Sequence, residues 1–380
     1  ARRGIQTLVL EASARVGGCI NSQKFPDCGG YWVEAGTHTC YNSYGHLLDI
    51  LDDLGLMARL SPKAKVNFSL WRDGKRQSLL SALHPWELLL SVPRLFTATK
   101  AGLSIRDYYT AGLGAANYRD LFGPAFSAVI CQEADDYPAE LLFRRKPRRK
   151  GVLRSFTLPQ GLSEIPLAIV AQPGLMVRTG QSLREVRRVG GGFRLLMTDG
   201  GELNCATLSL ATPPDVAARL LDGPTGPVID REAVLAMAGI GMREIESLVL
   251  CVPTQALGHL PPTAGFIAVA DAFNAMVSRD YLADGSFRGF SFHFRPGDLT
   301  PQQQQERACT ALGIEPGDVV SWVQVHNRLP ALRVGHGRRV ACIDTALAGT
   351  RLGITGNWFQ GVSVEDCLTR SHQECERLFA

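Results

Sequence analysis

Several features are missing from the sequence, and each absence narrows the protein's class. No run of eighteen or more uninterrupted apolar residues occurs in the 380 residues, which argues against a transmembrane helix. The ten cysteines include no CxxC pair and the eight histidines no HExxH or paired spacing, so we assign no metal. The net charge is only +4 and no nucleic-acid-binding motif accompanies it, so we expect no nucleic-acid partner. The chain opens without a signal-peptide pattern, which predicts a cytoplasmic protein with reduced thiols.

The composition is that of a globular protein with a large core. With 45% hydrophobic residues and 39 glycines, the chain is expected to divide into two or three domains. The apolar stretch 78–96 is interrupted by prolines and charges, so it is either a helix pair packed on its own core or a segment lying on a membrane surface. The basic run FRRKPRRK (143–150) is either a solvated loop or a site for anionic lipid.

The first residues resemble the second strand of a dinucleotide-binding unit. Ile5 to Leu10 is an apolar β-type run that stops at Glu11, and in such units a strand-terminal acid accepts hydrogen bonds from ribose hydroxyls. That acid normally follows the glycine fingerprint by about 20 residues, which places the fingerprint before residue 1. We therefore expect the first strand, the phosphate-binding turn and most of the first helix to be missing, either because the gene product is truncated or because the protein has lost the element.

The residues that follow carry a family resemblance. Gly17 and Gly18 in VLEASARVGGCINS permit a close backbone approach to a ligand, and this segment resembles the strand-Glu and R-x-G-G-R motif of the flavin amine oxidase superfamily. Cys19 departs from the arginine that many relatives carry. GYWVEAGTHTCY (30–41) is similar to the next family segment, whose loop passes close to the isoalloxazine ring. The resemblance implies that Glu11, Gly17, Gly18, Ala35 and Gly36 bind FAD.

The resemblance continues in family order through the middle of the chain. SFTLPQGLSEIPLAIV (155–170) is similar to a family helix start, and residues 175–214 contain the hairpin signals GGG and DGG of a β-meander. In the family this meander covers the adenine side of the cofactor. The resemblance implies a backbone contact near Val186.

The segment RLGITGNWFQGVSVEDCLTRS (351–371) resembles the family's last cofactor element. A strand ends in Gly356 and Asn357, and a helix begins near Ser363. Unpaired N–H groups and the positive end of a helix dipole stabilise the negative charge of a reduced flavin. The resemblance assigns those N–H groups to Val362, Ser363 and Val364, and the GVSVEDC form is typical of protoporphyrinogen oxidases. Alone, Gly-Asn before a helix is also an ordinary turn.

We expect an α/β fold with a Rossmann-like FAD-binding domain, a mixed-sheet substrate domain and a helical insert. The predicted ranges are 1–60, 155–214 and 336–380 for the FAD-binding domain, 61–79 and 215–335 for the substrate domain, and 80–154 for the insert. In protoporphyrinogen oxidases the corresponding insert associates with membrane, which implies peripheral contact with its inner face. Phe266, Phe273 and Met276 are candidates for the substrate cavity, or plain core residues, since alternate strand positions face either way.

The resemblance predicts an FAD-dependent oxidoreductase that takes hydride from a large apolar substrate and passes electrons to oxygen or another acceptor. The preferred activity is oxidation of protoporphyrinogen IX to protoporphyrin IX. A carotenoid or other isoprenoid desaturase is an alternative, and so is a degenerate non-catalytic relative unable to bind FAD. An arginine in the cavity, with Arg279 or Arg288 in the right region, would favour the propionate-bearing porphyrinogen. The sequence names no catalytic residue.

Overall fold

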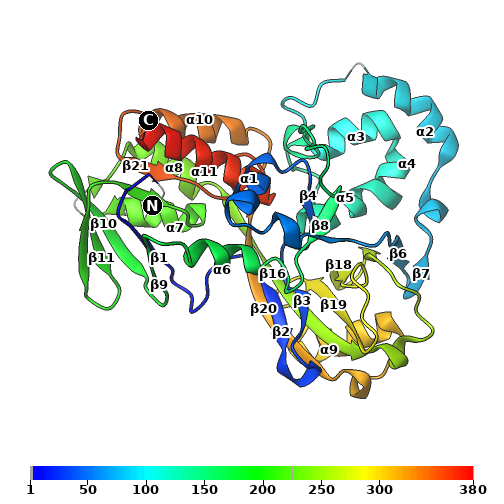
Figure 1. Cartoon of the computed structure of the whole chain (residues 1–380). Helices are drawn as coiled ribbons and strands as arrows, with labels where there is room; N and C mark the ends of the chain where they lie inside the picture. Colours follow the sequence, from blue (N-terminus) through cyan, green and yellow to red (C-terminus); the bar gives the residue numbers. More distant parts are fainter. Residues whose placement is uncertain (1–2, 97, 225, 380) are drawn as a thin grey trace.

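The chain folds into two lobes. The computed structural model describes residues 3–96, 98–224 and 226–379. Figure 1 shows both chain termini in one lobe, whereas the largest sheet and a group of helices coloured cyan and green lie in the other. The two lobes are joined by several chain crossings rather than by one linker, as expected when a domain is assembled from segments far apart in the sequence.

Two pairs of parallel strands lie in the lobe that holds the termini. β1 (Thr7–Leu10) pairs with β9 (Leu175–Arg178), and β13 (Leu208–Leu210) pairs with β21 (Leu352–Ile354). Within the described residues these form two separate two-stranded sheets. The helices of this lobe are α1 (Gly45–Asp53), α6 (Glu164–Val170), α7 (Pro214–Leu221), α8 (Arg231–Ala238), α10 (His336–Leu347) and α11 (Val364–Phe379). Parallel strands connected through helices confirm the predicted α/β class.

The predicted β-meander is present in the same lobe. It consists of β10 (Leu183–Val189), β11 (Gly192–Met197) and β12 (Glu202–Cys205), paired antiparallel in that order. The glycine-containing turns predicted as hairpin signals connect its strands. A short ladder of β14 (Asp222–Gly223) and β15 (Gly226–Pro227) follows α7.

One boundary differs from the sequence prediction. Residues 215–240 were expected in the substrate domain, but α7 and α8 share an apolar core with β10, β21 and α10. Ala217 and Leu221 of α7 and Met237 of α8 are buried there, beside Ile343 and Leu347 of α10. The apolar faces of these two helices pack in the parallel-strand lobe, so after residue 214 the chain returns to the substrate sheet only at the strand that starts with Gly241.

The second lobe is built on a seven-stranded sheet of order β20-β16-β19-β18-β17-β6-β7. Among the described strands of this sheet, β17 and β6 are the one pair that runs parallel. The strands are β6 (Phe68–Arg72), β7 (Lys75–Gln77), β16 (Gly241–Pro253), β17 (Gly265–Val269), β18 (Phe273–Ser278), β19 (Phe287–Phe294) and β20 (Ser321–Ala331). Helix α9 (Pro301–Leu312) covers one face, and the hairpin of β2 (Ser22–Phe25) and β3 (Tyr31–Glu34) packs on the other. The hairpin thus brings the cofactor motifs against this sheet.

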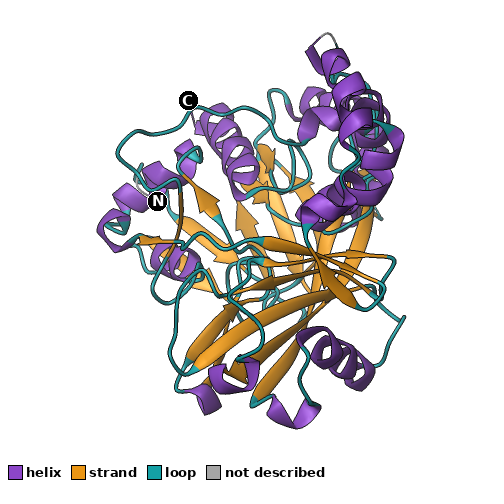
Figure 2. Cartoon of the chain, turned by 90° about the vertical axis from the view of Figure 1, so that its right-hand side faces the viewer, coloured by secondary structure: helices purple, strands orange, loops and turns teal. Residues whose placement is uncertain are grey.

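A small sheet and a group of helices complete the fold. β4 (Cys40–Tyr41), β8 (Ser155–Thr157) and β5 (Ser61–Pro62) form the small sheet. The helices are α2 (Pro85–Ser91), α3 (Ile105–Leu113), α4 (Ala115–Asn117) and α5 (Gly123–Ile130), and Figure 2 shows them gathered at one end of the molecule, above the strands. Among the described residues, no helix has the length and apolar composition needed to cross a bilayer.

Candidate functional site

The turn after β1 has the features expected of a ribose-binding site. The backbone N–H of Glu11 donates to the Arg178 carbonyl at 2.9 Å, and Oε1 accepts the Ser13 N–H at 2.7 Å. Both bonds hold the acid at the strand end. Gly17 has φ +107°, and a Cβ there would lie 2.8 Å from the Ile20 carbonyl oxygen. Gly18 has φ +54° with open space where its Cβ would be, so its backbone can be approached by a ligand.

The second predicted segment lies directly on the first. The Ala35 N–H donates to the Asn21 carbonyl at 2.8 Å, and the Thr37 N–H donates to the Cys19 carbonyl at 3.0 Å. A Cβ at Gly36 would lie only 2.2 Å from the Cys19 oxygen, so only glycine permits this contact. The Asn327 side chain of β20 donates to the Ala35 carbonyl at 3.0 Å, which ties the loop to the seven-stranded sheet.

The strand-to-helix joint at 354–364 is held on both sides. Gly356 has φ +148°, and a Cβ there would lie 2.7 Å from Nε1 of Trp358. The Trp358 indole donates to the Thr212 carbonyl at 3.1 Å, which fixes the joint to the turn after β13. The Arg370 guanidinium donates to the Ile354 carbonyl at 3.0 Å, which fixes α11 to β21. Asn357, half-buried, follows Gly356 at this joint.

The start of α11 is capped by its own side chains. Ser363 Oγ donates to Asp366 at 2.6 Å and accepts the Asp366 N–H at 3.1 Å. The Ser363 N–H also donates to Asp366, at 3.3 Å, and Lys146 pairs with the same carboxylate at 2.7 Å. A carboxylate is favourable at a helix N-terminus. Asp366 therefore accepts the Ser363 N–H. Of the three backbone N–H groups predicted to face the flavin ring, those of Val362 and Val364 remain as candidates.

Two of the predicted cofactor segments meet at one apolar cluster, and a third packs in the neighbouring core. Ile20, which follows the glycine pair, and Val364, which begins α11, pack on the cluster that includes Cys40 and Leu162. Val186 is 1% exposed in β10 and belongs to the neighbouring core with Ile354 of β21. Residues predicted from separate motifs therefore lie around the same region.

The structure places the three cavity candidates elsewhere. Phe266, Phe273 and Met276 are at most 1% exposed and lie in the core beneath α9. Phe266 stacks on Trp71 with ring centroids 5.7 Å apart. This is the face of the sheet opposite the β2–β3 hairpin, so the placement does not fit a cavity role and agrees with the alternative of plain core residues.

The two arginines of interest have different surroundings. Arg288 forms a buried pair with Asp280 at 2.5 Å and donates to the Leu260 carbonyl at 2.6 Å. Arg279 lies over the rings of Tyr31 and Trp32, with its guanidinium carbon 4.2 and 4.5 Å from the centroids. Arg279 therefore stacks on the hairpin, whereas Arg288 is committed to a structural ion pair.

Sequence reasoning missed a cluster of ionisable groups beside the 35–39 loop, in which Glu34 and Cys40 are buried and Lys63 is partly buried. Glu34 is 2% exposed and accepts from Ser22 Oγ and from the Leu162 N–H, both at 2.8 Å. Desolvation raises the pKa of Glu34 to about 7. Desolvation also lowers the pKa of Lys63 to about 8, and raises that of Cys40 to about 12. An isolated lysine in a loop gives no sequence signal for such a cluster, because its partners are distant in the chain.

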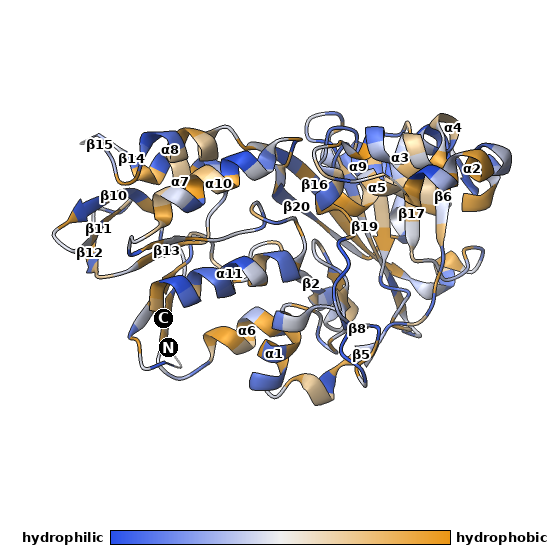
Figure 3. Ribbon diagram, turned by 90° about the horizontal axis from the view of Figure 1, so that it is seen from above, coloured by the Kyte–Doolittle hydropathy of each residue, from blue (hydrophilic) through white to orange (hydrophobic). Residues whose placement is uncertain are grey.

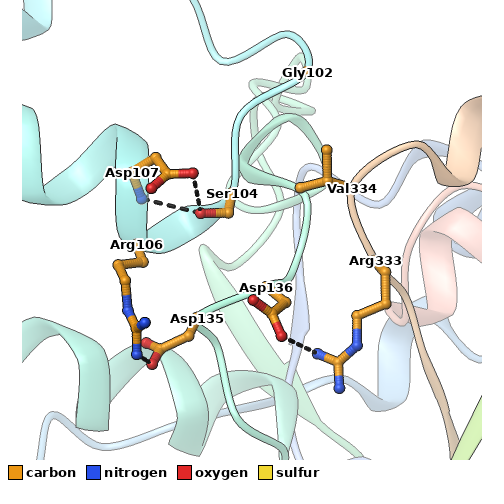
Figure 4. Close-up of a pocket in the computed structure, with 8 residues that line it drawn as sticks. All are labelled: Gly102, Ser104, Arg106, Asp107, Asp135, Asp136, Arg333 and Val334. Atoms are coloured by element: carbon orange, nitrogen blue, oxygen red, sulfur yellow. Dashed lines mark hydrogen bonds and ion pairs between the residues drawn. The ribbon is translucent and has the colours of Figure 1, made fainter.

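A separate polar cavity of about 490 Å³ lies between the helical group and the segment before α10. Figure 4 shows that its charged side chains face one another. Arg106 pairs with Asp135, Arg333 lies 3.8 Å from Asp136, and Ser104 caps α3 through Asp107. None of the predicted cofactor residues lines it, so we assign it no part in the site.

The residues present fit the two ends of an FAD molecule. Glu11 and the open backbone at Gly18 suit the ribose, and the joint at Gly356 with the start of α11 suits the flavin ring. The described residues hold no glycine-rich strand-to-helix turn of the kind that binds a pyrophosphate. The fit therefore rests on the ribose and flavin ends.

Comparison with known proteins agrees with this geometry. The family model described as flavin containing amine oxidoreductase matches residues 1–278. A structure named as a candidate protoporphyrinogen oxidase from Exiguobacterium sp. 255-15 is similar, with 17% identity, a TM-score of 0.74, and 97% of this chain and 91% of that chain covered. A putrescine oxidase with bound putrescine aligns at 12% identity and TM-score 0.73, covering 99% and 94%.

A fatty acid isomerase from P. acnes that produces CLA aligns at 13% identity and TM-score 0.74, covering 100% and 99%. At these identities the likeness is one of fold. The three named activities differ, so the shared architecture does not select a substrate.

Proposed function

The chain belongs to the family of flavin-containing amine oxidoreductases, whose cofactor is FAD, and from this membership we propose that it oxidises protoporphyrinogen IX to protoporphyrin IX. The observation that carries the proposal is the strand-to-helix joint GNWFQGVSVEDC (356–367), which has the form typical of protoporphyrinogen oxidases. The helical group around α2–α5 and the segment ATPPDVAARLL (211–221) support the same reading.

The chain's own residues would hold and orient the cofactor. When bound, FAD accepts a hydride from a carbon of the substrate. Glu11 would accept a hydrogen bond from a ribose hydroxyl, and the open backbone at Gly18 would let the cofactor approach closely. Gly36 would act indirectly, because its close packing on the Cys19 carbonyl oxygen positions the 35–39 loop. The N–H groups of Val362 and Val364, at the positive end of α11, would stabilise negative charge on the flavin ring. We infer positioning and electrostatic roles for these residues rather than acid or base catalysis.

Two other functions make different predictions. An isoprenoid desaturase would need a wholly apolar substrate cavity. Buried Arg279 stacks on the β2–β3 hairpin, on the face of the sheet that we propose is turned toward the cofactor, and this supports a substrate with carboxylates. A non-catalytic relative would fold without taking up FAD.

For the proposed oxidation, we propose that the reduced flavin passes its electrons to oxygen or to another acceptor.

We also propose peripheral membrane contact through the stretch 78–96. Trp86, Leu90 and Phe96 are 79, 77 and 85% exposed, and Leu80 is 76% exposed. Figure 3 shows the apolar colouring of α2 at the margin of the molecule. Leu88 and Leu95 pack inward, so the outward residues form an apolar surface suited to a lipid headgroup boundary. Sedimentation with anionic liposomes, and its loss in Trp86→Ser/Leu90→Ser, would test this.

The experiment for the main proposal has two readouts. The purified protein is expected to show the visible absorbance of an oxidised flavin, and addition of protoporphyrinogen IX under air should produce protoporphyrin fluorescence faster than the uncatalysed rate. If the protein shows a flavin spectrum, does not oxidise protoporphyrinogen IX and desaturates an isoprenoid, the alternative desaturase activity is supported. A folded protein that takes up no FAD would favour the non-catalytic relative.

A further inference from the structure

Lys63 makes a set of contacts that its place in the sequence does not predict. It follows β5, and its ammonium group donates to the His38 carbonyl and to Thr39 Oγ1, both at 2.7 Å. The same nitrogen lies 3.5 Å from the centroid of the Tyr281 ring. A cation that is removed from water gains appreciably from such a ring contact. One side chain therefore contacts two segments that are more than 200 residues apart.

The first of these segments continues the predicted cofactor loop. Gly36 lies with its backbone against Cys19, and the next residue, Thr37, donates its N–H to the Cys19 carbonyl at 3.0 Å. His38 and Thr39 follow Thr37. The loop is thus fixed at its beginning by the strand-to-glycine segment near residue 19. Lys63 fixes its end, which leaves Ala35 and Gly36 in a defined position between the two attachments.

The second segment belongs to the seven-stranded sheet. Tyr281 follows β18 and is 5% exposed, and its carbonyl accepts the Ala64 N–H at 2.8 Å. The backbone at Ala64 and the side chain of Lys63 therefore attach the same short segment to the sheet. A shift of the sheet at Tyr281 would be transmitted through Lys63 to the loop at residue 38.

The charges around Lys63 explain why its protonation matters. Desolvation lowers its pKa to about 8, whereas the charges of Cys40 on β4 and Glu34 on β3 act in the opposite direction. The charge of Arg279 also acts on Glu34, and the Tyr281 ring faces Lys63 from the sheet. Burial and the charge of Lys63 lower the pKa of the His38 imidazole to about 4, so this neighbour is neutral between pH 6.5 and 9.5. None of the ion pairs among the described residues includes Lys63, so a carbonyl, a hydroxyl and a ring hold its charge.

We propose that Lys63 is a positioning residue that sets the 35–39 loop against FAD and couples this loop to the substrate sheet. The inference rests on the proposed function, because it takes that loop to be a cofactor contact. Protonated Lys63 donates to both loop acceptors while facing the ring. The neutral amine keeps at most two N–H donors and loses the charge that strengthens all three contacts. Cofactor affinity is therefore greatest while Lys63 is charged.

The test compares Lys63→Met with Lys65→Met. Lys65 is exposed and two residues away, so the control changes the same residue type in the same segment. Holoprotein is diluted, and the fluorescence of released FAD gives the dissociation constant between pH 6.5 and 9.5. We expect Lys63→Met to weaken FAD binding about tenfold at pH 7, the scale of one lost hydrogen bond from a charged donor. In wild type and Lys65→Met, FAD binding should weaken as pH rises through about 8. In Lys63→Met, the dissociation constant should show no such change near pH 8.

The possible results separate the two proposals. If wild type and Lys65→Met hold no FAD, the proposed function fails. If they hold FAD and folded Lys63→Met binds it with the same affinity and the same pH profile, the positioning role is overturned. If circular dichroism shows that Lys63→Met does not fold, Thr39→Val replaces it, because this variant removes one acceptor and keeps the shape. The role then requires an FAD affinity about threefold weaker, and an unchanged affinity overturns it.

Discussion

Replacing Glu34 by glutamine tests whether the buried acid beside the cofactor loop costs stability when it ionises. Its two carboxylate oxygens accept from Ser22 Oγ and the Leu162 N–H, both at 2.8 Å, and the side chain is 2% exposed. Desolvation raises its pKa to about 7 from 4.5, even though these hydrogen bonds and the charges of Lys63 and Arg279 act in the opposite direction. Glutamine has the shape of the protonated acid and can satisfy both neighbours.

The sign follows from proton linkage. A raised pKa means that the folded protein binds this proton more tightly than the unfolded chain does. Stability from Glu34 is therefore fully present below about pH 4.5 and is lost as pH rises to about 7. The interval between these values, at about 1.4 kcal/mol per unit, corresponds to about 3 kcal/mol. Above pH 7 the folded state carries the whole cost.

The assay is urea unfolding of wild type and Glu34→Gln from pH 4.5 to 8 at a fixed FAD concentration. We expect the variant's advantage in unfolding free energy to grow with pH and to level off near pH 7 at about 3 kcal/mol. Glu232→Gln, on the exposed first turn of α8, is the matched control for the same chemical change outside the buried cluster. A variant that is less stable than wild type at pH 7, or a difference independent of pH, would refute the reasoning, because Lys63 and Arg279 would then hold Glu34 ionised.

Three other substitutions test the site and its support. Gly36→Ala should weaken FAD binding in dilution assays, because its Cβ would lie 2.2 Å from the Cys19 oxygen; normal affinity would contradict the close contact. Asp280→Asn should lower the free energy of unfolding by about 3–5 kcal/mol, because it leaves Arg288 buried without its partner; a loss under 1 kcal/mol in urea unfolding would argue against the pair. Phe273→Ala should lower the free energy of unfolding by about 3–5 kcal/mol and leave KM unchanged in steady-state assays, because the ring faces α9. A raised KM with normal stability would instead indicate that Phe273 lines the substrate cavity.

The local structure of the segments that we propose as cofactor contacts could be predicted from the sequence, because its signals are local. The glycines at 17, 18, 36 and 356 occupy backbone conformations or contacts that favour glycine, and Glu11 directly follows the last residue of a short strand. The meander likewise follows from turn residues next to alternating strands. Such features depend only on neighbouring residues. The order of the motifs along the chain supported the family assignment more strongly than any single motif.

Other features could not be predicted, because they depend on which faces meet. Phe273 alternates along β18 as a cavity residue would, yet it faces α9, and the pattern of a strand does not say which of its faces packs on which layer.

The sequence by itself determined the family and the α/β class, and it predicts the segments that would surround FAD, because each of these depends on short stretches of chain. The tertiary structure alone decided that α7 and α8 join the parallel-strand lobe, that Asp366 takes the Ser363 N–H, and that Lys63 joins the 35–39 loop to Tyr281. The physical reason is distance along the chain. Packing, desolvation and charge act between residues brought together only by folding, and these long-range contacts set the protonation and position of the groups around the cofactor.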